Sequence, residues 1–456
     1  MEKTIIARLA KKCTENNNID PSLYRSYNVK RGLRNENGSG VLVGLTEISM
    51  VVGFEKRDED VVPVEGQLAY RGISVNDIVN GLKSEDRFGY EEVAYLLLFG
   101  VLPTRSELKE FLKYYALQRH LPGNFVRDII LTFRTHNVMN SLARSVLALY
   151  SRDDTADDTS LENLVRQAIN LVAKFPVIVA YAFHAMQNKF HGGSLFIHQP
   201  QDALSTAENF LYMMRSDGKF TALEARVLDV MLILHADHGG GNNSTFTTRV
   251  VSSSGTDTYS AIAAAIGSLK GPLHGGANAS VMKMMADIKE NVNNWTNRQQ
   301  VKDYMAKLLK KEAGDKSGKI YGFGHAIYTQ SDPRAVILKD YAQRLAKQKK
   351  REKELDLYLT MEEVVPAVFN EIKGAKVISP NVDFFSGFVY DCLGIPQDVY
   401  TPLFAVARVA GWMAHRIEEL MVSPRIIRPA YKNVTVRRDY LPLTSRKRKQ
   451  AKDSNA

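Results

Sequence analysis

The sequence predicts a mainly α-helical protein in which a large helical domain carries a smaller, mobile helical domain inserted into it. Apolar residues recur at three- and four-residue spacing through most of the chain, which is typical of helices. Alternating β-branched runs are confined to about residues 40–53 and 433–437. A length of 456 residues is too great for one small domain. These observations together favour a two-part helical fold.

Three helices can be delimited from the signals at their ends. Residues 91–99 form an apolar run that stops at Gly100, a residue suited to a helix C-terminus. Thr221 is an N-cap candidate in front of a second helix. Residues 401–420, rich in Ala and Val, predict a third. The apolar face behind Thr221 consists of Leu223, Val227, Met231 and Leu234.

The domain boundaries follow from a change in composition. After the glycine-rich stretch at residues 271–276 the chain is lysine-rich and less aromatic, and it regains buried character at residues 382–385. Glycine-rich segments at such borders suit hinges. The predicted parts are residues 1–274 and 381–443 for the large domain, 275–380 for the small domain, and 444–456 for a disordered basic tail.

The overall composition excludes several classes of protein. With 45% hydrophobic and 24% charged residues, the chain matches an ordinary globular protein rather than a disordered or collagen-like one. It has no stretch of about 18 uncharged apolar residues, so we expect no membrane span. Two cysteines, Cys13 and Cys392, make no disulfide framework, and the N-terminus lacks the apolar core of a secretory signal. The cytoplasm is therefore the expected location.

The formal net charge of +10 comes from two local clusters. Residues 437–452 carry +6 and residues 339–353 carry +5, so the rest of the chain is about neutral. A nucleic-acid-binding face would interleave aromatic residues with the basic ones, and the C-terminal cluster has none in residues 445–452. We interpret this cluster as a solvated terminus, with a polyanion-binding patch as the alternative.

Four histidines stand in short polar or glycine-rich contexts, where the backbone can approach a ligand closely. They are His235, His238, His274 and His325. No His-Glu-x-x-His or Cys-x-x-Cys pattern accompanies them, so a metal site is not expected. The His-Gly-Gly-Gly string at His238 resembles that of esterases, but the chain has no Gly-x-Ser-x-Gly nucleophile motif. Nucleotide-binding glycine motifs are also missing.

Asp383 and several arginines complete the candidate chemistry. Asp383 is flanked by large apolar residues, and burial raises the pKa of a carboxyl group and makes it a stronger base. The alternative is a structural aspartate that caps a helix. Arg408 lies in an apolar stretch, where an arginine needs an anionic partner. Arg334 follows His325 by nine residues, and Arg428 precedes Pro429 near the C-terminus. Several arginines beside histidine motifs favour recognition of a polycarboxylate.

At these residues the sequence resembles the citrate synthase family, including its 2-methylcitrate synthase members. The resemblance extends over about residues 44–443. Its most specific part is three motifs that occur in the same order and at the same spacing as in the family. These are Gly271-Pro-Leu-His-Gly-Gly-Ala-Asn, Gly322-Phe-Gly-His and Asn381-Val-Asp-Phe-Phe-Ser-Gly. It implies a small domain that closes over substrates, a homodimer or multiple of dimers, and condensation of acetyl-CoA with oxaloacetate followed by hydrolysis of the thioester. It implies no cofactor besides this co-substrate and no metal.

The resemblance also implies roles for individual residues. Asp383 would remove a methyl proton of acetyl-CoA, His274 would hydrogen-bond the thioester oxygen, and His325 would hydrogen-bond or protonate the oxaloacetate carbonyl. The groups that would hold the carboxylates are His238, Arg334, Arg408 and, from the partner subunit, Arg428. The backbone leading to His325, including Gly322 and Gly324, would hold the adenine of CoA, and Lys373 and Lys376 would contact its phosphates.

Two other functions stay open on the sequence. A 2-methylcitrate synthase, which uses propionyl-CoA, would differ by a few pocket residues that the motifs do not identify. A non-catalytic CoA- or polyanion-binding relative is less favoured because His274, His325 and Asp383 are all present. Two departures from many relatives are Ala326, where arginine is common, and the glycine run at residues 239–241.

Overall fold

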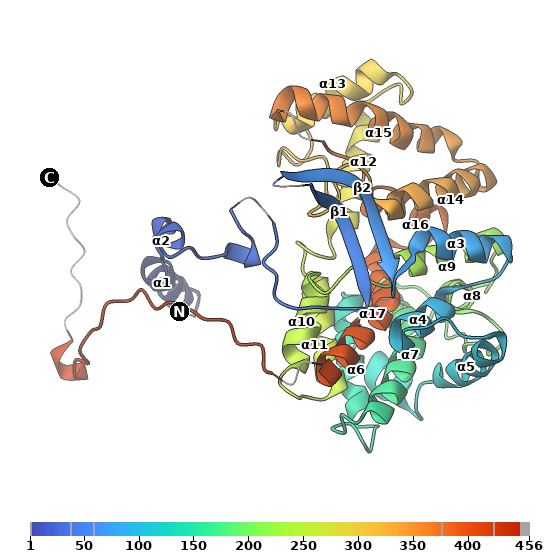
Figure 1. Cartoon of the computed structure of the whole chain (residues 1–456), viewed down its shortest axis with the longest axis horizontal. Coiled ribbons are helices and arrows are strands. Elements are labelled where there is room, and N and C mark those ends of the chain that lie inside the picture. Colours follow the sequence, from blue (N-terminus) through green and yellow to red (C-terminus); the bar gives the residue numbers. More distant parts are fainter. Residues whose placement is uncertain (1, 37–38, 58–59, 375–376, 423–424, 447–456) are drawn as a thin grey trace.

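Helices dominate the structure, a computed structural model that describes residues 2–36, 39–57, 60–374, 377–422 and 425–446 (Figure 1). The mainly α-helical prediction is confirmed. Within the described residues, one antiparallel sheet has the order β1-β2-β3. Its strands are β1 (Ser49–Arg57), β2 (Asp60–Tyr70) and β3 (Ile73–Ser74).

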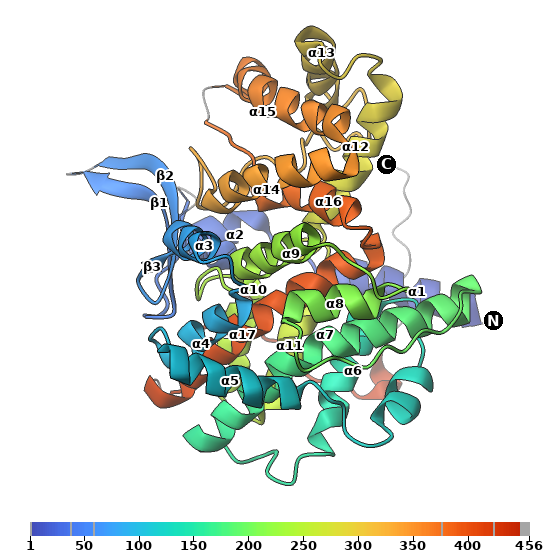
Figure 2. The same ribbon diagram turned by 90° about the vertical axis from the view of Figure 1, so that its right-hand side faces the viewer.

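Most helices form a large layered group (Figures 1 and 2). Helices α12 to α15 form a second group, which lies above the large one in both views. The large group contains α3 (Val75–Ser84), α4 (Tyr90–Phe99), α5 (Arg105–Gln118), α6 (Val138–Tyr150), α7 (Leu161–His191), α8 (Thr206–Met214), α9 (Ala222–His235), α10 (Asn243–Ser252), α11 (Thr258–Lys270) and α17 (Tyr400–Val422). The second group contains α12 (Ala277–Asn291), α13 (Arg298–Leu309), α14 (Pro333–Lys349) and α15 (Glu352–Lys373), with α16 (Val382–Cys392) between the groups. The exact domain borders stay a prediction.

The three helices delimited from the sequence are confirmed. Helix α4 ends at Gly100, whose φ of 83° is the left-handed conformation that glycine adopts without strain. Helix α9 begins behind Thr221, which forms a reciprocal capping box with Glu224. Helix α17 covers the Ala- and Val-rich run and is buried along most of its length.

The two strand predictions had different outcomes. Within residues 40–53 a strand begins only at Ser49, where it pairs with Tyr70 of β2. The prediction at residues 433–437 is wrong, because that segment is irregular and mostly exposed. A β-branched alternation forms a strand only where another strand supplies backbone hydrogen bonds, and no described strand lies beside it.

Helix α7 is long and apolar enough to cross a membrane by length and composition alone. Its apolar window is 94% buried inside the protein. A helix that is hydrophobic all round is expected at the centre of a large core. Helix α7 is therefore a core helix of this fold.

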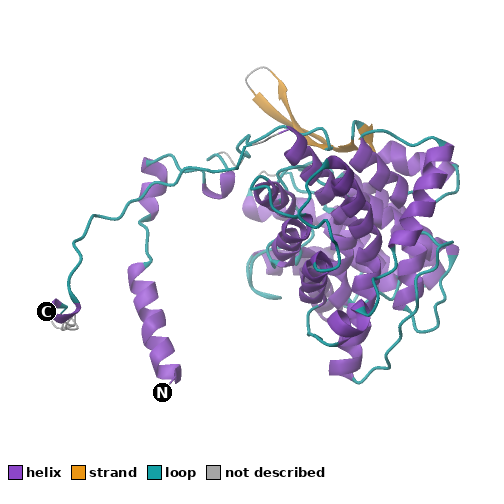
Figure 3. Ribbon diagram, turned by 90° about the horizontal axis from the view of Figure 1, so that it is seen from below, coloured by secondary structure: helices purple, strands orange, loops and turns teal. Residues whose placement is uncertain are grey.

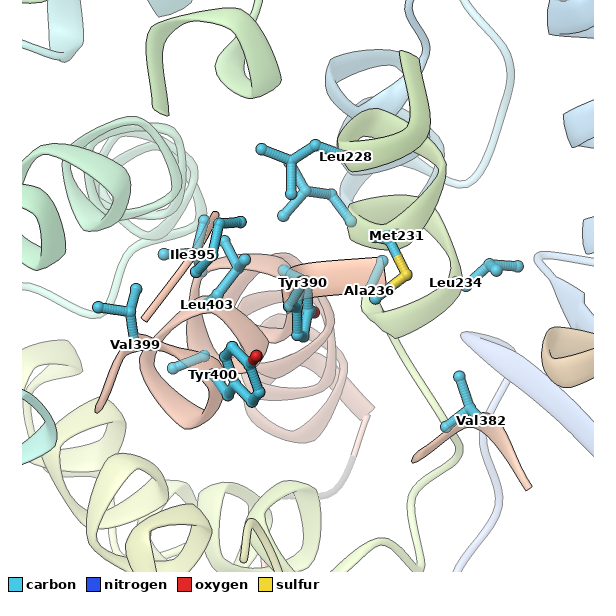
Figure 4. Close-up of a cluster of buried hydrophobic side chains, with 14 of the residues drawn as sticks. Leu228, Met231, Leu234, Ala236, Val382, Tyr390, Ile395, Val399, Tyr400 and Leu403 are labelled. Carbon is cyan, nitrogen blue, oxygen red and sulfur yellow. The ribbon is translucent and has the colours of Figure 1, made fainter. Parts of the chain in front are cut away.

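The C-terminal end of α9 packs against α16 and the start of α17 (Figure 4). Leu228 and Met231 of α9 belong to the same buried cluster as Tyr390 of α16 and Leu403 of α17. Close packing of apolar side chains fixes the relative position of these three elements. As a result, the segment after α9, the first turn of α16 and the middle of α17 converge.

Both terminal segments extend away from the helical groups (Figures 1 and 3), and the C-terminal one starts against α10, where the Ile427 backbone N–H donates to the Ser253 hydroxyl (3.0 Å). The N-terminal one contains α1 (Glu2–Asn16) and α2 (Pro21–Ser26), and the described C-terminal one covers residues 425–446. The two segments approach each other at a cation–π contact, in which Lys432 Nζ lies 5.8 Å from the centre of the Tyr27 ring. The predicted basic tail lies outside the described residues from residue 447 onward.

Candidate active site

A cavity of about 970 Å³ opens where α9, α14, α16 and α17 converge. It brings together residues that lie far apart in the sequence, from the end of α9, the segments before α12 and α14, the first turn of α16 and the middle of α17. The residues predicted for the site that line it are His238, His274, Gly324, His325, Arg334, Asp383 and Arg408. His235, singled out in the sequence as well, also lines it.

Two glycines shape the segment that carries His325. Gly322 and Gly324 both have φ of +82°, and a Cβ on Gly322 would lie 3.0 Å from Phe384. The Gly322 carbonyl accepts a hydrogen bond from the Asn381 backbone N–H (2.8 Å), and the Gly324 carbonyl accepts one from the Asn381 side-chain amide (2.8 Å). Asn381 is also the N-cap of α16. It therefore ties the His325 segment to the helix that bears Asp383.

His325 is held as a neutral hydrogen-bond donor. Its Nδ1 accepts hydrogen bonds from the backbone N–H groups of Ile327 (3.1 Å) and Tyr328 (3.2 Å). Burial, reinforced by the Arg334 charge, lowers the pKa of His325 to about 4. In a neutral imidazole with an accepting Nδ1, the proton is on Nε2. His325 can donate from that atom.

His274 has the opposite tautomer. Its Nε2 accepts a hydrogen bond from the backbone N–H of Ser244 (3.3 Å), and the Ser244 hydroxyl lies 3.0 Å from the same atom. Burial, with a smaller contribution from the Arg408 charge, lowers the pKa of His274 to about 4. The proton of the neutral ring is therefore on Nδ1.

His238 lies against His325 inside the cavity. The two ring centres are 5.0 Å apart in an edge-to-face arrangement, and the Tyr328 ring is 5.5 Å from His238. Burial and then the Arg334 charge hold the pKa of His238 well below its usual value. Its Nε2 is buried without a partner among the described residues, so it is available to a bound molecule.

Arg334 and Arg408, both in the cavity lining, differ in what they already bind. Arg334 is paired with Asp332, which accepts hydrogen bonds from Nε (3.0 Å) and Nη2 (2.7 Å). Arg408, fully buried on α17, donates from Nε to the His235 carbonyl (2.7 Å). Nη1 and Nη2 of Arg408 are buried without a partner among the described residues. A buried guanidinium with two unpaired nitrogens is suited to an anion that binds in the cavity.

Asp383 lies in the first turn of α16, two residues after the N-cap. Burial raises the pKa of Asp383 to about 6, against the opposing charge of Arg334. The carboxyl is therefore more basic than an ordinary aspartate and still mostly ionised at pH 7. Asn381 is the N-cap of this helix. The alternative considered for Asp383, a structural aspartate that caps a helix, is therefore wrong.

Three of the predicted ligand contacts lie outside the cavity lining. Arg428 is exposed in the C-terminal segment, Lys373 is exposed at the end of α15, and Gly322 packs against Phe384. Lys376 lies outside the described residues. Among the residues that the structure describes, no group of three or more His, Cys, Asp or Glu side chains is placed to hold a metal ion.

Several lining residues were missed by the sequence reasoning. Residues 32–34, Gly40, Val41 and Val43, ahead of the first strand, line the cavity, and the Arg34 charge contributes to lowering the pKa of His325. The centre of the Phe404 ring lies 4.6 Å from the guanidinium carbon of Arg408, and Tyr390 and Tyr400 also line the cavity. The aromatic residues were visible in the sequence, but no spacing related them to the histidine motifs.

Known proteins match this chain over most of its length. The family model described as "Citrate synthase, C-terminal domain" matches residues 37–430. A citrate synthase from Synechocystis sp. is 39% identical over 402 residues, covering 87% of this chain and 92% of the relative. A 2-methylcitrate synthase from Corynebacterium glutamicum is 35% identical and covers 92% of this chain and 98% of its own.

Solved structures show the same fold. The citrate synthase of Pyrobaculum aerophilum superposes with a TM-score of 0.72 at 32% identity, covering 90% of this chain and 95% of that one. A citrate synthase from Thermoplasma acidophilum was solved in a ternary complex with carboxymethyl coenzyme A and oxaloacetate. It superposes with a TM-score of 0.73 at 28% identity, covering 92% of this chain and 99% of that one. The shared fold and the matched length lead to one conclusion: this chain belongs to the citrate synthase family.

Proposed function

We propose that the protein condenses acetyl-CoA with oxaloacetate and hydrolyses the resulting thioester, so that citrate and CoA are released. The observation that carries the proposal is the Arg408 guanidinium, whose two unpaired nitrogens lie in the same cavity as the neutral rings of His238, His274 and His325 and as Asp383 with its raised pKa. An unpaired buried cation recognises a carboxylate, and the other groups suit proton removal beside a carbonyl. This reaction consumes two substrates and water and needs no resident cofactor.

The first step in this proposal is removal of a methyl proton from acetyl-CoA by Asp383. The electron pair left on carbon moves into the thioester carbonyl and places negative charge on its oxygen. His274, a neutral donor at Nδ1, would hydrogen-bond that oxygen. A neutral donor already aimed at the developing charge stabilises the transition state without a large reorganisation.

In the second step the enolate carbon attacks the ketone carbon of oxaloacetate. His325 would donate a hydrogen bond from Nε2 to the ketone oxygen, which gains, in net terms, the proton removed from the methyl carbon and becomes the hydroxyl of citrate. His238, Arg334 and Arg408 would hold the carboxylates and so orient the ketone. Water then cleaves the citryl thioester, and CoA leaves as the thiol. We propose that the group α12 to α15 closes over the substrates and excludes water until that point.

We propose a homodimer, or a multiple of dimers, in which Arg428 reaches the cavity of the partner subunit. Support comes from the two terminal segments, which expose large apolar residues such as Ile6 (59%), Tyr431 (95%) and Val436 (80%). Exposed apolar patches of this kind are typical of interaction surfaces. We further propose that the enzyme is cytoplasmic, and that backbone near Gly322 and Gly324, with Lys373 and Lys376, contacts CoA.

A 2-methylcitrate synthase is the second candidate. Relatives from Corynebacterium glutamicum with that name are 35% and 33% identical to this chain. The substrates differ by one methylene, which a pocket distinguishes by about 1–3 kcal/mol.

One assay tests both candidates. Purified protein is mixed with oxaloacetate and either acetyl-CoA or propionyl-CoA, and release of free thiol is followed. We expect thiol release with a higher kcat/KM for acetyl-CoA. A higher kcat/KM for propionyl-CoA would support the second candidate, and no thiol release with either thioester would contradict both.

A further inference from the structure

Asp237, the residue before His238, connects the candidate site to two other parts of the fold. It is fully buried. Its Oδ2 accepts hydrogen bonds from the Ser49 hydroxyl, at the start of β1, and from the backbone N–H of Gly239 (2.9 Å). The same oxygen lies 3.2 Å from Nε2 of His415 on α17. A buried carboxylate requires such partners, because its burial without them is costly.

The proton on His415 can be placed from its other neighbour. Arg249 approaches Nδ1 of His415 with Nε (3.2 Å) and Nη2 (2.7 Å). A guanidinium group only donates, so Nδ1 accepts and the ring proton is on Nε2, facing Asp237. The charge of Arg249 is balanced by ion pairs with Glu418 and Glu419. Nε2 of His415 is thus the donor to the Asp237 carboxylate.

The charge of Asp237 is maintained by these contacts. Burial by itself raises the pKa of Asp237, but the His415 imidazole, the Arg408 charge and the Ser49 hydroxyl outweigh it and hold the pKa below its ordinary value. An ionised carboxylate accepts stronger hydrogen bonds than a neutral one. The links from Asp237 to β1 and α17 therefore persist across the neutral pH range.

A glycine on α17 makes room for this arrangement. A Cβ on Gly411 would lie 2.4 Å from Oδ1 of Asp237 and 2.5 Å from the Ala236 carbonyl oxygen. Both distances are far shorter than van der Waals contact. The segment after α9 can lie against α17 only because residue 411 has no side chain.

We propose that Asp237 and His415 are positioning residues that aim His238 at oxaloacetate. The inference rests on the proposed function of His238. Asp237 fixes the main chain on both sides of that histidine, by its own anchoring to α17 and by the hydrogen bond it accepts from Gly239. With both neighbours held, the His238 ring keeps its place 5.0 Å from the His325 ring.

The test compares Asp237→Asn and His415→Leu with His415→Gln. Oxaloacetate affinity is measured by isothermal titration calorimetry, and KM for each substrate by thiol release. For the first two variants we expect oxaloacetate binding to weaken about tenfold or more, with KM for acetyl-CoA within about twofold. In His415→Gln the amide nitrogen can replace Nε2 as the donor, so oxaloacetate affinity should stay within about threefold of wild type.

Asp229→Asn is the matched control. Asp229 lies on α9, is fully buried, and accepts hydrogen bonds from the backbone N–H groups of Gly89 and Tyr90, away from the cavity. This variant should leave oxaloacetate affinity unchanged. An equal loss in Asp229→Asn and Asp237→Asn would show a general loss of structure and overturn the proposal.

A second pair of variants, both glycine to alanine, tests the proposal if a variant of Asp237 or His415 does not fold. Gly411→Ala pushes Asp237 away without removing any polar group, whereas Gly267→Ala on α11 adds a methyl group with nothing within 4 Å. Only Gly411→Ala should weaken oxaloacetate binding. Folded Gly411→Ala or Asp237→Asn protein with wild-type oxaloacetate affinity would overturn the positioning role alone. A wild-type protein that neither binds oxaloacetate nor releases thiol would contradict the proposed function itself.

Discussion

The backbone N–H of Ser244 donates a hydrogen bond to Nε2 of His274 (3.3 Å) and thereby places the ring proton on Nδ1. His325 is the mirror case, because two backbone N–H groups occupy its Nδ1 and leave the proton on Nε2. The two proposed catalytic histidines therefore have opposite tautomers. Each tautomer is determined by backbone groups, which a change of pH near neutrality does not alter.

Opposite tautomers predict opposite outcomes for amide substitutions. The asparagine amide nitrogen stands near the position of Nδ1 and the glutamine amide nitrogen near that of Nε2. We expect His274→Asn to retain more kcat than His274→Gln, and His325→Gln to retain more than His325→Asn. Loss of the donor should cost about 10²–10³-fold in kcat. Steady-state kinetics of the four variants checks this, and the same order at both positions would contradict the assignment.

Asp383 is expected to be the base. Asp383→Ala should lower kcat about 10²–10⁴-fold, as loss of a general base does, while calorimetric oxaloacetate affinity changes little. Asp391→Ala is the control, since that aspartate lies on the same helix and is exposed in an ion pair with Arg351. Full turnover in Asp383→Ala would show that another group removes the proton.

The raised pKa of Asp383 predicts how activity and stability depend on pH. Activity should rise as pH passes about 6, because only the ionised carboxylate accepts a proton. Stability should change in the opposite direction. The folded pKa of about 6 exceeds the ordinary value of 3.8, so the stabilising contribution is present below about pH 4 and is lost as pH rises through 6.

Asp383→Asn should consequently be more stable than wild type at neutral pH. The gain in the free energy of unfolding should be about 1–3 kcal/mol at pH 7 and should vanish near pH 4. Denaturant unfolding at the two pH values measures it. An asparagine variant that is less stable at pH 7 would show that the carboxylate is better accommodated than its burial indicates.

Arg408 is expected to provide most of the stabilisation that a bound anion confers. Oxaloacetate or citrate should raise the Tm of the wild type, and Arg408→Gln should lose that shift while its KM for oxaloacetate rises at least about tenfold. Arg416→Gln is the matched control, because Arg416 is buried on the same helix but donates to Ser252 and Thr258. It should lower the Tm and keep the ligand shift. A full shift in Arg408→Gln would exclude Arg408 as the anion partner.

Mixing two inactive variants tests whether Arg428 acts across a dimer. In a mixed dimer of Asp383→Ala and Arg428→Ala subunits, one of the two sites has both residues intact. An equal mixture that exchanges subunits should recover about a quarter of wild-type activity, since half of the dimers are mixed. No recovery after verified exchange would mean that Arg428 serves its own subunit's site or none.

Local signals predicted the parts of this fold that depend on neighbours in the chain. The end of α4 at Gly100 and the N-cap at Thr221 depend only on neighbouring residues, and both were predicted correctly. The strand expected at residues 433–437 failed because strand formation depends on a partner from elsewhere in the chain. The first sheet strand was placed only approximately for the same reason.

The sequence by itself determined the helical class, the family motifs and the residue types available for chemistry at His274, His325 and Asp383. Only the tertiary structure decided what those side chains can do. Backbone N–H groups determine the tautomers, and burial raises the pKa of Asp383. Nη1 and Nη2 of Arg408 are unpaired because no acceptor among the described residues lies within hydrogen-bonding distance. The link from Asp237 to His415 joins residues 178 positions apart. A hydrogen bond and the local dielectric depend on distances in space, and no spacing along the chain specifies them.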